Sequence, residues 1–438
     1  MTSPIHTQPA DLSAQSDEAL LDRFQRGAFG YFLETFNPIN GLSADTTRPG
    51  APASIAVVGF ALSAYPVGVE RGWISRDEAA ARALTTLRFC WNARQDGGED
   101  ATGYRGFFYH FLDMATGARV WRCELSPIDT ALLVAGMLTA AGYFSRATPA
   151  ETEIRGLADA IYRRVDWSWA QAGKATVRQG WKPKSGFLHY GWEGYSEAIL
   201  LYALGLASPT HPLSDASYEA WTETYQWENI YGRDLLYAGP LFIHLYSHAW
   251  IDFLGLRDRF MREKRSDYFE NSRHAVLIQR EYARRNPHGY LGYDENGWGL
   301  TANDGPGFKT LRVDGRKRRF FSYAARGVPY GPDDGTLAPW APLAALPFAP
   351  EPSLSALRQL CQRHARVVED SRLPSGFNPT LAEPGSEGWI SEGYFGLDQG
   401  IVVLMVENHR SGLIWRLMRR CPYLGPGLHR AGFRGGWL

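Results

Sequence analysis

A helical spacing of apolar residues recurs from one end of the chain to the other and restricts the folds open to it. Aromatic-rich loops with Gly and Pro separate the periodic stretches, and neither a Gly/Ser linker nor a low-complexity tract interrupts the series. We expect about a dozen helices, with bounds good to about three residues. Their expected ranges are 17–36, 52–68, 76–94, 126–144, 151–165, 194–206, 240–253, 266–285, 335–346, 352–369, 398–409 and 411–420.

An unbroken series of this kind predicts one closed helical body. An α-solenoid would show a tandem repeat of about 34 to 47 residues, and the sequence has none. Six helical hairpins closed into a ring, an (α/α)6 toroid, fit the expected number of helices. We therefore predict an all-α fold in which residues 1–16 form a flexible N-terminal segment and residues 17–438 a single domain. One small β-hairpin is expected, with residues 107–112 turning through 115–117 into 119–121.

Composition and charge exclude several classes of protein. The 46 Lys and Arg residues balance 46 Asp and Glu residues, so the chain lacks the basic excess that attracts a polyanion, and no nucleic-acid partner is expected. No run of about 18 apolar residues is present, so no membrane span is expected. The 15 Trp and 22 Tyr residues each combine an apolar ring face with a polar tip, which suits a wet cleft that stacks ring-shaped ligands.

The cysteines and the N-terminus indicate the compartment. The 4 Cys residues are far apart and form no CxxC, so a disulfide scaffold or a zinc ribbon is not expected. The first 18 residues are polar and acidic and contain no signal peptide. A cytoplasmic location is therefore expected, with the periplasm as the alternative.

Several common chemistries lack their motifs. The sequence contains no HExxH, no GxSxG, no GxxxxGK[ST] and no GxGxxG after a strand. His244 and His248 are four residues apart, which is a spacing for two metal ligands on a helix. Their aromatic and apolar neighbours favour packing instead, and no third ligand accompanies them. We expect neither a metal nor a cofactor.

Carboxylates within aromatic loops remain as the groups that can carry chemistry. Glu193 lies between Trp192 and Tyr195, whose rings would desolvate a carboxyl and raise its pKa, as a general acid requires. Glu197 follows at the start of the expected helix. Both glutamates are also explained by a favourable interaction with a helix N-terminus.

Further acids lie at the starts of helices or in turns. Asp398 begins an apolar helix, where it is either an N-cap or a carboxylate kept ionised by backbone N–H groups. Glu124 and Asp129 lie where the expected hairpin leads into a helix, and one of them is a candidate catalytic group. Three acids in turn-like sequences are candidates for hydrogen bonds to a sugar: Asp304, Asp333 and Asp334.

Two carboxyl groups in an aromatic cleft are the minimum apparatus for glycoside hydrolysis. One protonates the leaving oxygen, and the other activates water or attacks the sugar carbon. The distance between them distinguishes the outcomes, since about 5–5.5 Å implies retention and about 6.5–9.5 Å inversion. If Asp398 and Asp129 act with Glu193, all three should line one cleft.

Seven segments carry a further signal: residues 52–56, 68–74, 106–111, 192–195, 246–253, 332–336 and 398–400. Together they resemble the glycoamylase-like family, which includes bacterial endo-β-1,2-glucanases and the processing domain of cyclic β-1,2-glucan synthases. The resemblance extends from about Leu20 to about Phe433. It implies an (α/α)6 catalytic domain, chemistry without a metal, and β-1,2-glucan or its oligosaccharides as substrate. It also implies an inverting mechanism with Glu193 as the acid, while Asp398, Asp129 and Glu124 stay candidates for its partner.

Other interpretations stay open. The same fold serves a transglycosylase, a cyclase or a hydrolase of another glucan, and a carbohydrate-binding protein without activity is the alternative from another class. Residues 312–319 are more basic than the resemblance predicts. We expect a solvated loop there, with recognition of an anionic substituent or cover over the cleft as alternatives. The candidate substrate ligands are Glu124, Trp192, Tyr195, Glu197, His248, Asp304, Asp333 and Asp334.

Overall fold

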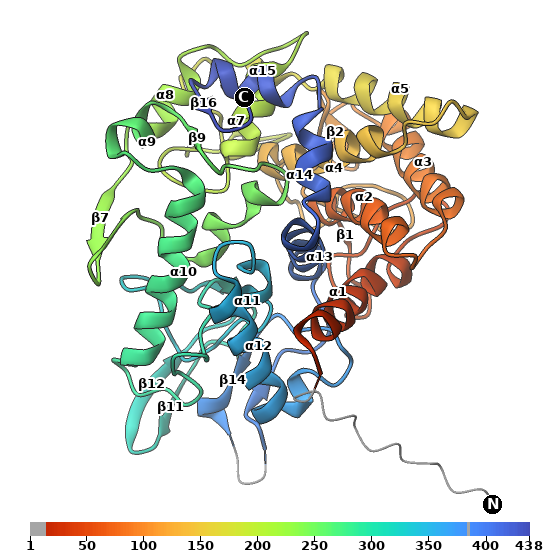
Figure 1. Ribbon diagram of the computed structural model, residues 1–438. Coiled ribbons are helices and arrows are strands. Elements are labelled where there is room, and N and C mark those ends of the chain that lie inside the picture. Colours follow the sequence, from red (N-terminus) through yellow and green to blue (C-terminus); the bar gives the residue numbers. More distant parts are fainter. Residues whose placement is uncertain (1–14, 383–385) are drawn as a thin grey trace, which may run out of the picture.

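The computed structural model describes residues 15–382 and 386–438 (Figure 1). The longer helices are α1 (Asp17–Glu34), α2 (Ile55–Glu70), α3 (Arg76–Asn92), α4 (Pro127–Tyr143), α5 (Pro149–Arg164), α7 (Ile199–Ala207), α10 (Tyr268–Arg285), α12 (Pro350–Arg363) and α13 (Gly396–Arg410). The shorter ones are α6 (Trp167–Ala170), α8 (Ser217–Thr222), α9 (Arg259–Lys264), α11 (Ala341–Ala344), α14 (Leu413–Arg419) and α15 (Leu424–Arg430). Single 3₁₀ turns are η2 (Leu241–His244), η3 (Tyr246–Ala249), η4 (Ala365–Val367) and η5 (Pro379–Leu381). Apart from residues 15 and 16, the N-terminal segment predicted to be flexible lies outside the described residues.

Short polar side chains begin several of these helices. Ser75, Ser126 and Thr148 each accept a hydrogen bond from the backbone N–H three residues on, which satisfies a donor that the helix leaves free. Pro127 and Pro149 occupy the first helical position, where a missing N–H costs nothing. The starts predicted for these helices are confirmed to within two residues.

The helices form a buried central set and an outer set. α2, α4, α7 and α13 are buried almost all round, as helices with apolar residues on every face must be. α2 packs against α4 and α13, α4 against α7, and α13 against α11 and η3. The outer helices bury one face each, with α1 on α13, α3 on α2 and α5, and α12 on α11. The prediction of a mostly helical fold is confirmed.

Glycines allow the two central helices α2 and α4 to touch. A Cβ added at Gly136 would lie 2.1 Å from the carbonyl oxygen of Gly59, and one added at Gly59 would lie 2.4 Å from that of Leu132. The backbones therefore approach more closely than any larger residue would permit.

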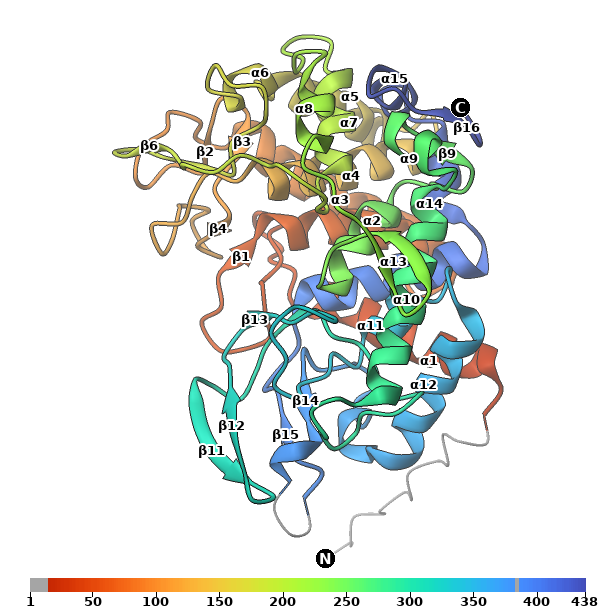
Figure 2. The same ribbon diagram turned by 90° about the vertical axis from the view of Figure 1, so that its left-hand side faces the viewer.

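The strands are short and pair in twos throughout the described chain. They are β1 (Ala53–Ser54), β2 (Gly103–Tyr104), β3 (Phe107–Phe108), β4 (Phe111–Leu112), β5 (Trp181–Lys182), β6 (Gly186–Phe187), β7 (Trp227–Ile230), β8 (Arg233–Leu236), β9 (Leu256–Arg257), β10 (Ala302–Asn303), β11 (Lys309–Val313), β12 (Arg316–Phe320), β13 (Ala324–Ala325), β14 (Phe377–Asn378), β15 (Trp389–Ile390) and β16 (Arg434–Gly435). All pairs are antiparallel, and β1 pairs with β4 and β10 with β13. In Figure 2 the strands β1 to β6 and β10 to β13 project from the same side of the helical body.

The prediction of one β-hairpin is wrong in its extent. β4 pairs with β1, and only an isolated bridge joins Leu112 to Arg119. The longest hairpin is β11–β12, within the basic stretch expected to be a loop. Asp314 and Gly315 turn it with φ angles of 48° and 73°, the two positive values of a type I′ turn.

Three predicted helices are shorter in the structure. Residues 240–253 form η2 and η3 rather than one helix. The helix predicted over 335–346 is reduced to α11, because Leu337 pairs with Phe377 in extended backbone. The one predicted from residue 194 begins at Ile199, because Gly194 has a φ of 77°. The helices α6, α8, α9 and α15 lie outside every predicted range.

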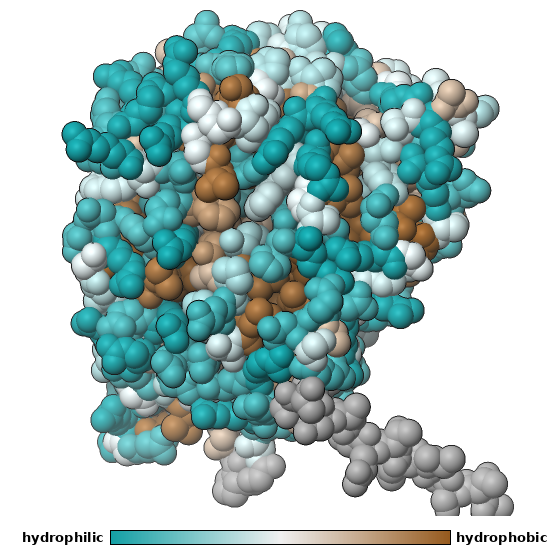
Figure 3. Space-filling model, in the orientation of Figure 1, coloured by the Kyte–Doolittle hydropathy of each residue, from teal (hydrophilic) through white to brown (hydrophobic). Residues whose placement is uncertain are grey.

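The face seen in Figure 3 is mostly hydrophilic, and apolar side chains show as narrow patches between polar ones. Within residues 15–382 and 386–438, no helix combines the length and apolar character that crossing a membrane requires.

Candidate active site

A cavity of about 510 Å³ lies where the strand-bearing loops meet the central helices. Its charged lining comes from five residues that are far apart in the sequence: Asp45, His110, Glu124, Asp129 and Glu197. Aromatic rings make up much of the remaining wall: Phe111, Trp192, Phe242, Tyr246, Tyr323 and Phe395. Carboxylates among aromatic rings are the environment that the sequence predicted for a sugar site.

Backbone pairing brings Glu124 and Asp129 to His110. Ser126 caps α4 and donates its hydroxyl to Asp129 Oδ2, which fixes Asp129 in the first turn of the helix. The His110 N–H donates to the Glu124 carbonyl oxygen at 3.0 Å, so the two loops run side by side. Both acids therefore face the cavity from the start of one helix.

His110 lies between these two carboxylates. Its Nδ1 is 2.9 Å from Glu124 Oε1, and its Nε2 is 3.6 Å from Asp129 Oδ2. Burial lowers the pKa of an imidazole, but Asp129, Glu124 and Asp45 outweigh burial and raise the pKa of His110 to about 9. The hydrogen bond from His110 in turn lowers the pKa of Glu124, against burial, which raises it. At neutral pH this wall of the cavity holds an imidazolium beside the Glu124 and Asp129 side chains.

Glu197 is the carboxyl group best suited to hold a proton. It precedes α7 in a loop fixed by Ser247, whose hydroxyl donates to the Glu197 carbonyl oxygen at 2.6 Å. Burial, with a smaller contribution from the charge of Asp129, raises the pKa of the Glu197 carboxyl to about 7, although a hydrogen bond from its own backbone lowers it. A carboxyl with this pKa is protonated in a large fraction of molecules near neutral pH.

Asp45 lines the cavity, whereas Asp398 is buried close to Asp45 and outside the lining. The Gly396 N–H donates to the Asp45 carbonyl oxygen at 2.8 Å, which joins the Asp45 loop to the start of α13. Burial raises the pKa of Asp45 to about 6, while His110 lowers it. Asp398 is 5% exposed, its Oδ2 has no hydrogen-bond partner, and burial raises its pKa well above the ordinary value. Phe395, not Asp398, is the N-cap of α13, so the capping interpretation of Asp398 is wrong.

Glu193 lies away from the cavity lining. Its side chain is exposed, and its Oε1 accepts a hydrogen bond from the Thr176 hydroxyl at 3.0 Å. The left-handed turn at Gly194 separates Glu193 from Glu197, so that Trp192 and Glu197 face the cavity and Glu193 does not. This corrects the expectation that Glu193 shares one cleft with Asp129. Its catalytic role stays a prediction.

Tyr195 and His248 pack inside the protein instead of facing the cavity. Tyr195 stacks edge-on against Tyr225 and His244. His248 is 2% exposed, and its Nε2 lies 2.9 Å from the Ser272 hydroxyl. Burial lowers the pKa of His248 to about 3, so it is a neutral packing residue. Its role as a substrate ligand stays a prediction, and no cluster of three potential ligands for a metal occurs within the described ranges.

The acids of the predicted turns have partners of their own. Asp334 is fully buried and accepts two hydrogen bonds from Arg326 at 2.7 and 2.8 Å. Asp333 accepts from the hydroxyls of Tyr282 and Tyr293. These two carboxylates are engaged with side chains of the fold, and their role as sugar ligands stays a prediction. Asp304 is paired with Arg48 and accepts from Ser391 at 2.8 Å, close enough to Asp398 to raise its pKa.

Sequence reasoning missed four residues of the cavity. His110 lies within one of the segments that carry the family resemblance, but a single histidine gives no spacing signal. Asp45 lies in an ordinary Ser-Ala-Asp-Thr turn sequence. Tyr246 and Tyr323 resemble the chain's many other tyrosines. Only the fold brings the four together.

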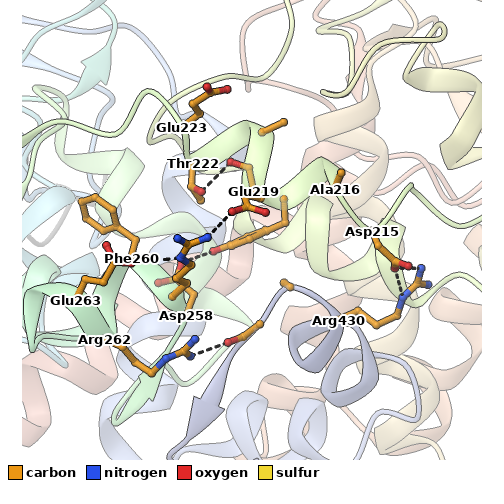
Figure 4. Close-up of a pocket in the computed structure, with 15 residues that line it drawn as sticks. Asp215, Ala216, Glu219, Thr222, Glu223, Asp258, Phe260, Arg262, Glu263 and Arg430 are labelled. Carbon is orange, nitrogen blue, oxygen red and sulfur yellow. Dashed lines mark hydrogen bonds and ion pairs between the residues drawn. The ribbon is translucent and has the colours of Figure 1, made fainter.

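A second hollow is larger, at about 720 Å³, and lies between α8, α9 and α15 (Figure 4). Most of its acids are engaged with neighbouring side chains. Asp215 pairs with Arg430, Glu219 and Glu263 pair with Arg259, and Asp258 accepts hydrogen bonds from two buried tyrosines. Because few aromatic rings line this hollow, the smaller cavity is the better candidate for chemistry.

A mostly helical fold with acids and aromatic rings in a cavity is typical of proteins that bind or cleave carbohydrates. Comparison with known proteins identifies the family. The Glycoamylase family model, described as "Putative glucoamylase", matches residues 189–422. This is more than half of the chain, and the chain therefore belongs to the Glycoamylase family.

Relatives with described activities are similar over nearly the whole chain. An exo β-1,2-glucooligosaccharide sophorohydrolase (non-reducing end) of Parabacteroides distasonis is 29% identical over 97% of this chain, which spans 59% of that relative's length. An endo-β-1,2-glucanase of Chitinophaga pinensis, solved with sophorotriose and glucose, is 28% identical with a TM-score of 0.83 over 97% of this chain and 100% of its own. A Bacteroides uniformis structure described in the same words as the family is 32% identical with a TM-score of 0.86, over 97% and 99%.

Proposed function

We propose that this protein is a glycoside hydrolase that cleaves β-1,2-linked glucan or its oligosaccharides. The observation that carries the proposal is the cavity, in which Glu197 has a pKa near 7 and faces a wall of carboxylates held by His110. The sophorohydrolase and endo-β-1,2-glucanase relatives support the choice of linkage.

Glu197 takes the role of general acid in this proposal. A proton donor must be protonated in the free enzyme, and the buried Glu197 carboxyl meets this requirement near neutral pH. Glu193, which the family resemblance favours, is exposed and hydrogen-bonded to Thr176. Glu193 stays the alternative general acid, and substitution of each glutamate in turn distinguishes the two candidates.

Asp129 is the better supported base. A base must be ionised, and Asp129 lies 3.6 Å from the His110 imidazolium and accepts the Ser126 hydroxyl. Burial raises the pKa of Asp398, which favours its neutral form, so a smaller fraction of Asp398 is ionised and able to accept a proton. Asp398 stays the second candidate. Inversion is the outcome we propose, in accordance with the family resemblance.

The arrangement of helices supports an (α/α)6 toroid as the scaffold. Six buried segments follow one another along the chain: α2, α4, α7, the η2–η3 pair, α11 and α13. Contacts join α2 to α4, α4 to α7, α11 to α13 and α13 to α2. Amphipathic helices such as α1, α3, α5, α10 and α12 lie outside them. We propose that residues 17–438 form one catalytic domain of this type.

A panel of glucans tests the function. The protein is incubated with linear β-1,2-glucan and with β-1,3-, β-1,4- and α-1,4-glucans, with and without EDTA, and products are separated by size and by anomer. We expect products from the β-1,2-glucan alone, with inverted anomeric configuration and no loss on chelation. Inertness toward β-1,2 linkages, or a cyclic product in place of hydrolysis, would contradict the proposal.

A further inference from the structure

The β11–β12 hairpin carries a concentration of positive charge without acidic partners. Residues 309–320 contain six Lys and Arg and one acid, Asp314, in a chain whose total charge is zero. None of the six forms an ion pair in the part of the chain that the structure describes. Exposed cations elsewhere on the chain, such as Arg88 and Arg94, do have acidic partners.

The register of the hairpin divides its cations between two faces. Arg318 is 7% exposed, donates to the Gly289 carbonyl oxygen at 2.9 Å and covers the ring of Tyr290. Arg316 donates to the His288 carbonyl oxygen at 3.2 Å. These alternate positions of β12 anchor the hairpin to the body of the protein, which accounts for two of the six cations.

The cations of the opposite face do not anchor the hairpin in this way, and Arg312 donates to the Gly315 carbonyl oxygen in the hairpin's own turn at 2.9 Å. Arg312 pairs directly across from Lys317, and Thr310 across from Arg319, so three cations share one exposed face. Like charges directly opposite each other on a two-stranded sheet are destabilising. The chain retains an unfavourable arrangement here, and a bound anion would relieve it.

The hairpin is continuous with the wall of the cavity. It connects β10, whose Ala302 lines the cavity, to β13, which pairs with β10. On the exposed face of the hairpin, the Arg319 guanidinium lies 5.4 Å from the centre of the Phe321 ring. Two residues further along the chain from Phe321, Tyr323 lines the cavity. In Figure 2, β11 and β12 extend downward from the region of β13. A ligand held by the cations can therefore belong to the same molecule that fills the cavity.

We propose that Arg312, Lys317 and Arg319 bind an anionic substituent on the glucan chain whose backbone occupies the cavity. This inference rests on the proposed function and names the substrate class as a glucan with carboxylate or phosphate esters. The occupant is the substrate rather than a separate acidic macromolecule, because the cations lie on a direct extension of the cavity wall. In this arrangement the sugar rings contact the aromatic residues of the cavity. The acidic substituents of the glucan contact the cations of the hairpin.

The test compares substrates that differ only in charge. Linear β-1,2-gluco-oligosaccharides are used unmodified, as succinyl half-esters and as phosphate esters, and kcat/KM is measured at low ionic strength. The triple variant Arg312→Gln, Lys317→Gln, Arg319→Gln removes the three cations. A control, Arg26→Gln, Lys174→Gln, Arg420→Gln, changes the net charge equally at exposed positions outside the hairpin and the cavity.

Wild type is expected to favour the anionic oligosaccharides about fivefold, as exposed ion pairs of ordinary strength would give. The hairpin variant should lose this preference and keep its rate on the unmodified substrate, while the control retains both. Salt at about 0.5 M should remove the preference, because it screens exposed charges. A difference between the succinyl and phosphate arms identifies which anion is preferred.

Two results would overturn the proposal. One is the absence of the expected charge preference or of its dependence on the hairpin. Wild type would then have equal kcat/KM for neutral and anionic oligosaccharides, or the hairpin variant would keep the preference for the anionic ones. The other is inhibition by polyglutamate as strong as that by the succinylated glucan, which would assign the face to an acidic protein. If wild type cleaves no β-1,2-glucan, the proposed function fails on its own. Calorimetric binding of neutral and succinylated oligosaccharides then still decides whether the hairpin recognises charge.

Discussion

At the scale of single residues, the carboxyl groups of the cavity differ in pKa because their surroundings differ. Burial raises the pKa of Glu197 to about 7, whereas the hydrogen bond from His110 lowers the pKa of Glu124. The same side-chain chemistry is thus prepared for a proton donor at one position and for an anion at another.

The pKa of Glu197 sets the alkaline side of the pH profile. Glu197 acts as an acid only while protonated, and its protonated fraction falls as the pH rises through about 7. We expect kcat/KM to fall about tenfold per unit above this pH. Initial rates on linear β-1,2-glucan from pH 4 to 10 define this alkaline limb. A rate that stays unchanged up to pH 9 would show that another group is the proton donor.

His110 sets the acidic side. Its imidazolium lowers the pKa values of Glu124 and Asp45, so the substitution His110→Gln should raise the pKa values of both carboxylates and shift the acidic limb upward. The alkaline limb, which belongs to Glu197, should stay in place. His429→Gln, at an exposed position outside the cavity, serves as the control. Loss of activity without movement of the acidic limb would leave His110 with a merely structural role.

At the scale of elements, the contact between α2 and α4 depends on glycine. An alanine Cβ at Gly136 would lie 2.1 Å from the Gly59 carbonyl oxygen, so Gly136→Ala must push two buried helices apart. We expect it to lower the free energy of unfolding by about 1–3 kcal/mol.

The same helix provides the matched control. A Cβ at Gly142 would meet its nearest atom at 3.8 Å, an ordinary contact. Gly142→Ala should be neutral or stabilising by up to about 1 kcal/mol, because alanine is the better helix former. Thermal or denaturant unfolding of the two variants checks the pair, and equal stabilities would mean that the helices adjust freely.

At the scale of the whole molecule, local patterns predicted the helices and long-range contacts decided the site. The capped starts of α3, α4 and α5 are recognisable because a cap and its helix are neighbours in sequence. Glu193 and Glu197 are four residues apart in the same aromatic segment, and only the packing around them shows that Glu197 faces the cavity. The many charged residues of the β11–β12 segment indicate a solvated loop rather than strands. Its Asp-Gly turn is nevertheless a sequence signal for a hairpin.

The direct test of the account is the rate at which Glu197→Gln and Glu193→Gln hydrolyse linear β-1,2-glucan, beside wild type. Glutamine keeps the shape of each side chain and removes the proton that the acid must donate. We predict that Glu197→Gln lowers kcat by at least about a hundredfold, whereas Glu193→Gln keeps at least about a third of it. Full activity of Glu197→Gln together with collapse of Glu193→Gln would contradict the account and return the acid to the exposed glutamate.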